Sequence, residues 1–163
     1  MDRITPQQRS KTMAAIRSKD TSPEILVRRL VFSLGYRYRL HVGSLPGSPD
    51  IVLASSKKVI LVHGCFWHRH NCTLGIKMPK SRLDYWQPKL AKNKSRDAKN
   101  RQRLRRLGWN ILVIWECQTR DIKKLSTRLT KFLKSGTSSA QSSSHRNRGS
   151  PLTWHKSPRH RPG

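Results

Sequence analysis

Apolar residues recur every three or four positions in several parts of the chain, a pattern typical of helices with one buried face. Ser22-Pro23 begins the clearest example, because proline is favoured in a first helical turn, and Gly35 ends it. Thr5-Pro6 begins an N-terminal helix in the same way, and Asp121 caps a last one. The expected apolar faces of the second and last helices are Ile25, Leu26, Leu30, Val31 and Leu34, and Ile122, Leu125, Leu129 and Phe132.

Strands are predicted between these helices. Residues 36–42 alternate between apolar and polar side chains, which indicates a half-exposed strand. Residues 50–53 and 59–62 are short apolar runs joined by a polar turn, so we expect a hairpin. Residues 109–115 form a nearly continuous apolar run, expected to be a central buried strand.

The hairpin has a chemical consequence. It brings Asp50, at the start of its first strand, beside Val62 and His63, at the end of its second strand. An aspartate after a proline turn is often only a turn cap. Its position across from His63 nevertheless makes Asp50 a candidate for chemistry.

Residues 63–72 are the most unusual stretch, because ten residues hold three histidines, two of the three cysteines and the pair Phe66-Trp67. Buried imidazoles and thiols without partners are costly, so this collection indicates a purpose. Cys65, His70 and Cys72 are close enough in sequence to bind one ion. Cys117 is the one cysteine left to complete a set of four, and Cys/His sets favour Zn²⁺.

The residues alone also allow two different roles for the cysteines. Cys117 follows an apolar run, so it could be a small core residue. Two of the three cysteines could instead form a disulfide, although we expect no secretory signal and therefore favour metal or thiol chemistry.

The charge of the chain predicts a polyanionic partner. Thirty-five Lys and Arg face only eight Asp and Glu, giving a net charge of +27 over 163 residues. Nucleic acid and an anionic membrane both qualify, as does a ribosomal-type role based purely on charge. No apolar stretch is long enough to span a bilayer, and the basic residues are spread along the chain, which favours nucleic acid.

The length and the changes in composition predict one domain and a tail. Residues 1–134 carry all the apolar periodicity, whereas residues 135–163 are basic, rich in Ser, Arg and Pro, and expected to be disordered. Residues 81–107 are polar and intensely basic, and they predict either one helix or two helices separated by a break before Pro88. Trp86 is one of their few apolar anchors.

Several motifs taken together resemble the very-short-patch-repair (Vsr) DNA mismatch endonucleases. The resemblance covers roughly Thr5 to Leu133, and the histidine-cysteine motif is highly specific. The motifs are Leu45-Pro46-Gly47-Ser48-Pro49-Asp50, Val62-His63-Gly64, the stretch from Cys65 to Cys72, Lys92-Asn93, Arg96-Asp97, Leu107-Gly108-Trp109 and Trp115-Glu116-Cys117.

The resemblance implies a fold and a reaction. The fold would be α/β and restriction-endonuclease-like, of the PD-(D/E)xK type, with a mixed central sheet flanked by helices. The reaction would be a Mg²⁺-dependent nick in one strand of duplex DNA, 5′ to the thymine of a T:G mismatch left by deamination of 5-methylcytosine. That nick would initiate short-patch mismatch repair. A structural Zn²⁺ would be bound by Cys65, His70, Cys72 and Cys117.

The resemblance also implies roles for individual residues. Asp50 would bind the catalytic Mg²⁺ together with the backbone carbonyl of Val62, a position where the family commonly has threonine. His63, His68 and Asp97 would belong to the same site, and Glu24 would reach it through metal-bound water. The aromatic side chains expected to wedge into the base stack are Phe66, Trp67 and Trp86, with Met13 approaching from the other groove.

Position alone gives a simpler role to three of these residues. Glu24 could only complement its helix dipole, Asp97 could form a surface ion pair, and Trp86 could pack in the core. The expected partner is duplex DNA with a T:G mismatch, with mismatch-repair proteins as a further candidate. We expect a monomer in the bacterial cytoplasm, associated with the nucleoid and not with a membrane.

Two rival functions share most of these features. A zinc-stabilised protein that binds distorted DNA without cutting it would have the same charge, zinc ligands and aromatic residues. It would not need Asp50, His63 or His68. A restriction-type nuclease of the same fold would cut fully paired duplex equally well.

Overall fold

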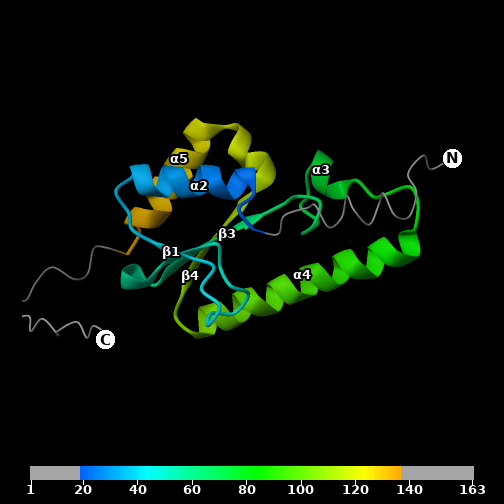
Figure 1. Ribbon diagram of the computed structural model, residues 1–163, viewed down its shortest axis with the longest axis horizontal. Coiled ribbons are helices and arrows are strands. Elements are labelled where there is room, and N and C mark those ends of the chain that lie inside the picture. Colours follow the sequence, from blue (N-terminus) through cyan, green and yellow to red (C-terminus); the bar gives the residue numbers. More distant parts are fainter. Residues whose placement is uncertain (1–18, 137–163) are drawn as a thin grey trace, which may run out of the picture.

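The computed structural model describes residues 19–136, and a four-stranded mixed sheet forms its centre (Figure 1). The strand order is β1-β2-β3-β4, with antiparallel pairing from β1 to β3 and parallel pairing between β3 and β4. The mixed α/β class predicted from the sequence is therefore confirmed. The strands are β1 (Arg39–Leu40), β2 (Ile51–Leu53), β3 (Lys58–His63) and β4 (Asn110–Trp115).

Helices cover both faces of this sheet. α2 and α5 lie together on one face, and α4 crosses the other face, where it supplies the crossover that a parallel β3–β4 pair requires (Figure 1). The helices are α2 (Ser22–Ser33), α3 (Thr73–Ile76), α4 (Leu83–Arg106) and α5 (Ile122–Lys134), with short 3-10 turns η1 (Ala54–Ser56) and η2 (Glu116–Arg120).

The main core lies between the sheet and the α2–α5 layer. Its fully buried side chains include Val27 and Val31 from α2 and Ile60 from the centre of β3. A smaller core under α4 contains Val52, Val59 and Leu104. β3 thus sends alternate side chains to opposite faces, and all six of its residues are buried.

The hairpin is confirmed, but two of the expected strands differ from the structure. β4 lies at the edge of the described sheet and only Leu112 and Ile114 are buried in it, so the central position predicted for residues 109–115 is wrong. An apolar run indicates that both faces of a strand are covered, but it does not show whether one or both edges pair with other strands. β1 keeps only two of the seven residues expected, because His41 adopts a positive φ of 46° that ends the pairing.

The helices also differ in detail from the predictions. α4 continues through Pro88 without a break, so of the two alternatives expected for this region the single helix is the one present. In α5, Leu133 is buried with Leu125 and Leu129, whereas Ile122 is 51% exposed and lies off the buried face. Asp121 does cap α5, since its side chain accepts a hydrogen bond from the Lys124 backbone N–H.

Some predictions lie outside the described residues. These are the N-terminal helix with Met13 and most of the tail, from residue 137 onward. Within residues 19–136, none of the helices combines the length and the apolar character needed to cross a membrane.

Candidate active site and metal centre

Three cysteines and a histidine converge at the ends of β3 and β4. The potential ligand atoms of Cys65, His70, Cys72 and Cys117 all lie within 4.8 Å of one another. His70 Nδ1 lies 3.8 Å from the Cys65 sulfur and 3.5 Å from the Cys117 sulfur. Tetrahedral coordination with Zn–S of about 2.3 Å and Zn–N of about 2.0 Å separates such atoms by roughly 3.6 Å. The four side chains could therefore hold one tetrahedral ion, and no disulfide joins them.

The loop after β3 is shaped to bring these ligands together. Gly75 is buried against the loop, and a Cβ there would lie 2.0 Å from the His70 carbonyl oxygen, so only glycine fits. Glu116, just after β4, accepts a hydrogen bond from the Cys65 N–H at 3.1 Å. The Trp115 ring stacks on His70 with centroids 4.3 Å apart. The closing ligand, Cys117, comes from η2, and its N–H donates to the Cys65 sulfur.

The thiols of this cluster differ in acidity. Burial raises the pKa of Cys65 to about 12 and also raises the pKa of Cys117. For Cys72 burial is outweighed by the hydrogen bond with His70, and its pKa falls to about 6. Thiolates are the metal-binding form, so a cation is needed to ionise the two more resistant thiols near neutral pH.

Asp50 lies where the hairpin prediction puts it. The Val62 N–H donates to Asp50 Oδ2 at 2.7 Å, which fixes this carboxylate beside the end of β3. The pKa of Asp50 is raised to about 6, chiefly by burial; the hydrogen bond from the Val62 N–H lowers it, and the nearby Glu24 carboxylate raises it. A carboxylate this reluctant to ionise is suited to binding a cation, which supplies the missing compensation.

His63, His68 and Asp97 form the second part of the site. The rings of His63 and His68 are stacked with centroids 4.0 Å apart and an interplanar angle of 9°. His68 Nδ1 is hydrogen-bonded to an oxygen of Asp97, which belongs to α4. Asp97 is therefore no simple surface ion pair, since its side chain is only 11% exposed.

The electrostatics of this part follow from burial and from the pairing. Burial by itself would raise the pKa of Asp97. The hydrogen bond with His68 outweighs burial, so the pKa lies below its usual range. Burial, followed by repulsion from His68, lowers the pKa of His63 to about 3, so this ring stays neutral. Among the described residues, His63 Nδ1 is a buried polar atom with no hydrogen-bond partner.

Glu24 is buried in the first turn of α2 and does more than complement the helix dipole. It accepts hydrogen bonds from the Asp20 N–H, the Thr21 hydroxyl and the Arg28 guanidinium. The side chain is only 4% exposed. It connects to Asp50 through His41, which lies 3.8 Å from Glu24 Oε2 and 3.9 Å from Asp50 Oδ1.

Sequence reasoning missed His41 and Arg28. The alternation of residues 36–42 places His41 on the exposed side of a strand, yet its side chain is only 16% exposed. Arg28 follows Glu24 by four residues, and this helical spacing for an ion pair was the one available signal.

The three aromatic residues expected to act together do lie together. Phe66 contacts Trp67 and Trp86 with ring centroids 5.1 and 5.6 Å apart, and Trp67 lies 6.0 Å from Trp86. Lys89 lies over the rings of both tryptophans. Asn93 on α4 donates to the Trp67 carbonyl, which ties the loop to the helix. Trp86 is buried at 8% exposure, so it packs as a core residue in this resting state.

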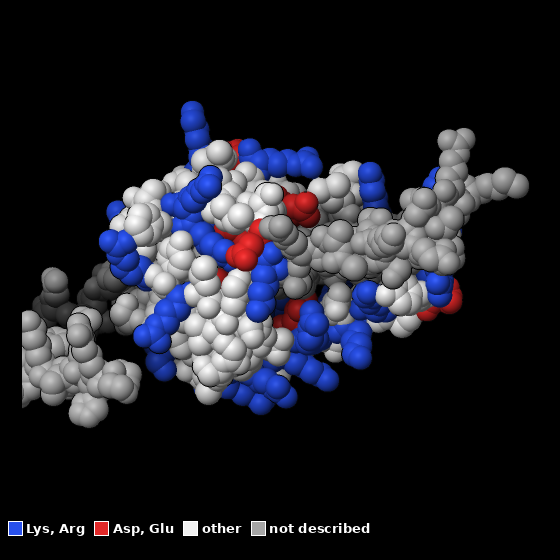
Figure 2. Space-filling model, in the orientation of Figure 1, with Lys and Arg blue, Asp and Glu red and all other residues white. Residues whose placement is uncertain are grey.

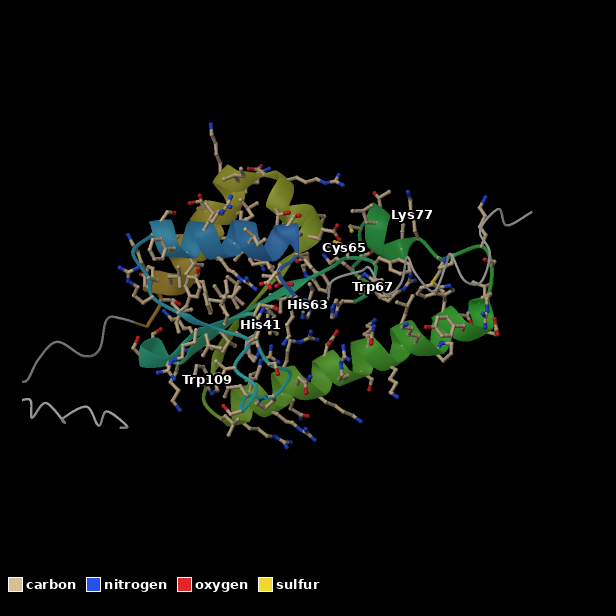
Figure 3. All side chains as sticks on the ribbon, in the orientation of Figure 1. His41, His63, Cys65, Trp67, Lys77 and Trp109 are labelled. Carbon is tan, nitrogen blue, oxygen red and sulfur yellow. The ribbon has the colours of Figure 1, made fainter. Side chains whose placement is uncertain are left out.

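Basic side chains are spread over the surface of the described residues. Figure 2 shows Lys and Arg spread over the visible face, with Asp and Glu confined to a few small patches. The labelled His63, Cys65 and Trp67 follow one another along the end of β3 and the loop beyond it (Figure 3). The short segment from His63 to Trp67 therefore carries a candidate catalytic, a metal-binding and an aromatic residue next to one another.

Comparisons with known proteins point to one family. The family model described as DNA mismatch endonuclease Vsr matches residues 1–74. The chain is 48% identical over 132 residues to the type II nicking enzyme V.XorIIP of Xanthomonas oryzae pv. oryzae, covering 81% of this chain and 96% of that protein. It is 43% identical to the DNA mismatch endonuclease Vsr of Escherichia coli over 72% of this chain and 75% of that protein.

One solved structure is a more distant match. It is the catalytic domain of the homing endonuclease I-Bth0305I, with 20% identity and a TM-score of 0.47 over 69% of this chain and 94% of that domain. A resemblance this distant does not establish a shared fold.

Proposed function

This chain belongs to the Vsr family of DNA mismatch endonucleases, and we propose that it nicks one strand of duplex DNA 5′ to the thymine of a T:G mismatch. Deamination of 5-methylcytosine produces such mismatches, and the nick would initiate short-patch repair. One observation carries the proposal. At the end of β3 the Val62 N–H binds the Asp50 carboxylate, and the next residue, His63, stacks on His68, which is hydrogen-bonded to Asp97.

The oxygen atoms of Asp50 and of the Val62 carbonyl would hold Mg²⁺, which prefers hard oxygen ligands. An ion held there would contact the scissile phosphate and make an attacking water more acidic. A backbone carbonyl oxygen is available as a metal ligand whatever side chain the residue carries. Valine in place of the threonine common in the family therefore keeps this ligand and removes only a hydroxyl.

His68 is the base that we assign to the reaction. The ionised Asp97 accepts the Nδ1–H of His68, which leaves Nε2 with a lone pair that can take a proton from water. The neutral His63 ring stacked on it limits how His68 can move and adds no competing charge. The buried Nδ1 of His63 is free to bond to a phosphate oxygen. Glu24 would act from farther away, through water on the metal.

The four Cys and His ligands would hold Zn²⁺ in a structural role. All four positions of a tetrahedral ion are filled by protein, so the ion has no open site for chemistry. Its effect would be to fix the loop that carries His68 and the aromatic residues.

The aromatic residues would allow the enzyme to recognise a mismatch selectively. Phe66, Trp67 and Trp86 would insert beside the mispaired step, where unstacking costs less than at a paired step. Met13, which lies outside the described residues, would approach from the other groove. The excess of Lys and Arg would contact phosphates and position the enzyme without reading sequence.

The setting of the enzyme is part of the proposal. The mixed sheet with Pro49-Asp50 directly before β2 supports a restriction-endonuclease-like fold of the PD-(D/E)xK type. We expect a monomer that works in the bacterial cytoplasm on nucleoid DNA, with mismatch-repair proteins as candidate partners. The net charge of +27 supports DNA as the principal partner.

The test is a nicking assay with the zinc-loaded full chain. Strand-labelled duplexes carry T:G, T:A or 5-methylcytosine:G at one position, with several flanking sequences, and are incubated with and without Mg²⁺. We expect a nick 5′ to the mismatched thymine that needs Mg²⁺, and far less cutting of both paired duplexes. Asp50→Asn should abolish it, and Asp84→Asn, the same change at an exposed position of α4, should not.

The remaining outcomes identify the rival functions. Equal cutting of paired and mismatched duplex would indicate a restriction-type nuclease. Tight binding of the T:G duplex without any nick at any Mg²⁺ concentration would indicate a binding protein and overturn the proposal.

A further inference from the structure

His41 lies between two carboxylates that belong to different elements. Its Nε2 is 3.8 Å from an oxygen of Glu24 on α2, and its Nδ1 is 3.9 Å from Asp50 Oδ1 at the start of β2. Glu24 and Asp50 are both buried or nearly so, at 4% and 18% side-chain exposure. The imidazole of His41 thus lies between the carboxylates of Glu24 and Asp50.

Arg28 determines which nitrogen of His41 carries the proton. The guanidinium Nη2 lies 2.8 Å from His41 Nε2, and a guanidinium can only donate hydrogen bonds. Nε2 must therefore accept, which places the N–H of the neutral ring on Nδ1, the atom that faces Asp50. The same guanidinium also donates to Glu24. The result is a chain of contacts from Glu24 through Arg28 and His41 to Asp50.

The backbone is shaped for this contact. The register of β1 with β2 pairs Leu40 with Ile51, so the next pair would be His41 and Asp50. At this point His41 takes a φ of 46°, in a region that residues other than glycine rarely adopt. Strand β1 ends there, and the side chain lies inside the molecule instead of on the exposed side of a strand (Figure 3).

The cluster does not fit a cation site of its own. Asp20, Glu24 and His41 have potential ligand atoms close enough to bind one ion. Arg28, however, bonds to all three of them. A guanidinium there already supplies the positive charge, and its donors use the lone pairs that a metal would need.

We propose that His41 is a positioning residue, held by Arg28, that orients the Asp50 carboxylate for a divalent cation and couples Glu24 to it. The proposal rests on the function proposed above. The Val62 N–H is bonded to Oδ2, and the Nδ1 of His41 lies 3.9 Å from Oδ1, so each oxygen of the carboxylate has a polar neighbour before an ion arrives. Groups that orient metal ligands in this way affect metal affinity without touching the metal.

The test compares divalent ion binding in zinc-loaded wild type, His41→Ala, His41→Gln and the control Ser44→Ala, an exposed position in the following loop. Binding of Mn²⁺ to the protein alone is followed by electron paramagnetic resonance, and the Mg²⁺ midpoint of nicking is measured on T:G duplex. We expect His41→Ala to raise both midpoints about tenfold or more. The nicking rate at saturating Mg²⁺ should change much less, and His41→Gln should recover part of the loss.

A second arm tests the link to Arg28. Arg28→Gln should raise the metal midpoints as well, and the double variant Arg28→Gln with His41→Ala should be little worse than His41→Ala alone. Non-additive effects are expected when two residues act through one path. Additive effects would mean that Arg28 does not act through His41.

The outcomes separate this inference from the function. If His41→Ala and His41→Gln leave the metal midpoints unchanged, the inference is wrong, whether or not the melting temperature falls. The function stands in that case, provided that wild type nicks the T:G duplex and Asp50→Asn does not. If wild type neither binds Mn²⁺ nor nicks, both proposals fail together.

Discussion

The two ligand-rich regions of this protein share one loop but are built differently. The Cys65–His70–Cys72–Cys117 cluster takes three of its four members from eight consecutive residues, and its side chains face one another. The group around Asp50, by contrast, draws its side chains from α2, β2, β3, the following loop and α4. The first region is closed by the protein itself, whereas the second has groups with unused capacity, such as His63 Nδ1.

This difference indicates a division of labour along the loop. A closed four-ligand cluster suits a structural ion, and an open set of carboxylate and imidazole groups suits chemistry on a substrate. The two regions are also physically joined, because Trp115 contacts His70 on one side and His63 on the other. Loss of the closed cluster should therefore damage the open one, but the reverse should not hold.

Removing a ligand of the closed cluster should have the largest effect. We expect Cys117→Ala to lose stoichiometric zinc, to lower the melting temperature by roughly 10 °C or more and to abolish nicking. The reason is that the loop carrying His68 depends on the ion for its shape. Zinc content by atomic absorption, melting by circular dichroism and the T:G nicking assay check this. Zinc-depleted wild type restored by added zinc is the control.

A different result would break the comparison. If Cys117→Ala keeps wild-type nicking, the two regions are independent, and the cysteines have no structural role for the reaction.

Replacing the proposed base should remove chemistry and leave the closed cluster intact. We expect His68→Ala to lower the nicking rate about 10²- to 10⁴-fold, the usual contribution of a positioned acid or base. Zinc content, melting temperature and affinity for the T:G duplex should stay close to those of wild type. Single-turnover nicking and a binding titration measure the two effects separately. Asn71→Ala, in the same loop but exposed, is the matched control.

Unchanged turnover in His68→Ala would refute the assignment of the base. Lost zinc in the same variant would show that the regions cannot be separated in the way proposed.

The contrast between the regions also explains what could be predicted from sequence. The closed cluster was predictable because spacing within one loop limits where its ligands can go, and Cys117 was the one cysteine left. The contact of Asp50 with Val62 followed from a hairpin, which is also local. Contacts that depend on how distant elements pack were less accessible.

His41 and β4 show why the rest was out of reach. The alternating pattern put His41 on an exposed side, because the pattern carries no sign of the positive φ that this residue adopts. Helices pack against both faces of β4, so its residues are mostly apolar although no further strand pairs with its outer edge in the described sheet. An apolar run of this kind is also typical of a central strand. The two-residue length of β1 has the same origin as the position of His41.

The aromatic residues should give a smaller effect that is confined to recognition. We expect Trp67→Ala to weaken binding of the T:G duplex by about 1–3 kcal/mol, the usual value of one base–aromatic stack. Trp67→Phe should lose less. The preference for T:G over T:A should fall, while zinc and Mg²⁺ dependence stay unchanged. Fluorescence anisotropy on both duplexes measures this, with Phe32→Ala, on α2 and 54% exposed, as control. An equal loss on T:G and T:A would assign Trp67 to general DNA contact.

The smallest effect concerns pH and distinguishes the two regions by their ionisation. Because the pKa of Asp50 is raised to about 6, chiefly by burial, this carboxylate is protonated below that pH and must lose a proton to bind a cation. Its affinity for Mn²⁺ should therefore be flat above about pH 7 and fall by at most about tenfold per pH unit below pH 6.

In the absence of metal, the contribution of Asp50 to folding stability changes with pH in the opposite direction. The raised pKa favours the folded state below the usual value of 3.8, and this contribution is lost as pH rises through 6. Mn²⁺ titrations from pH 5 to 8, with melting curves at each pH, test both statements on zinc-loaded protein. A Mn²⁺ affinity that stays constant down to pH 5 would mean that Asp50 does not hold the ion.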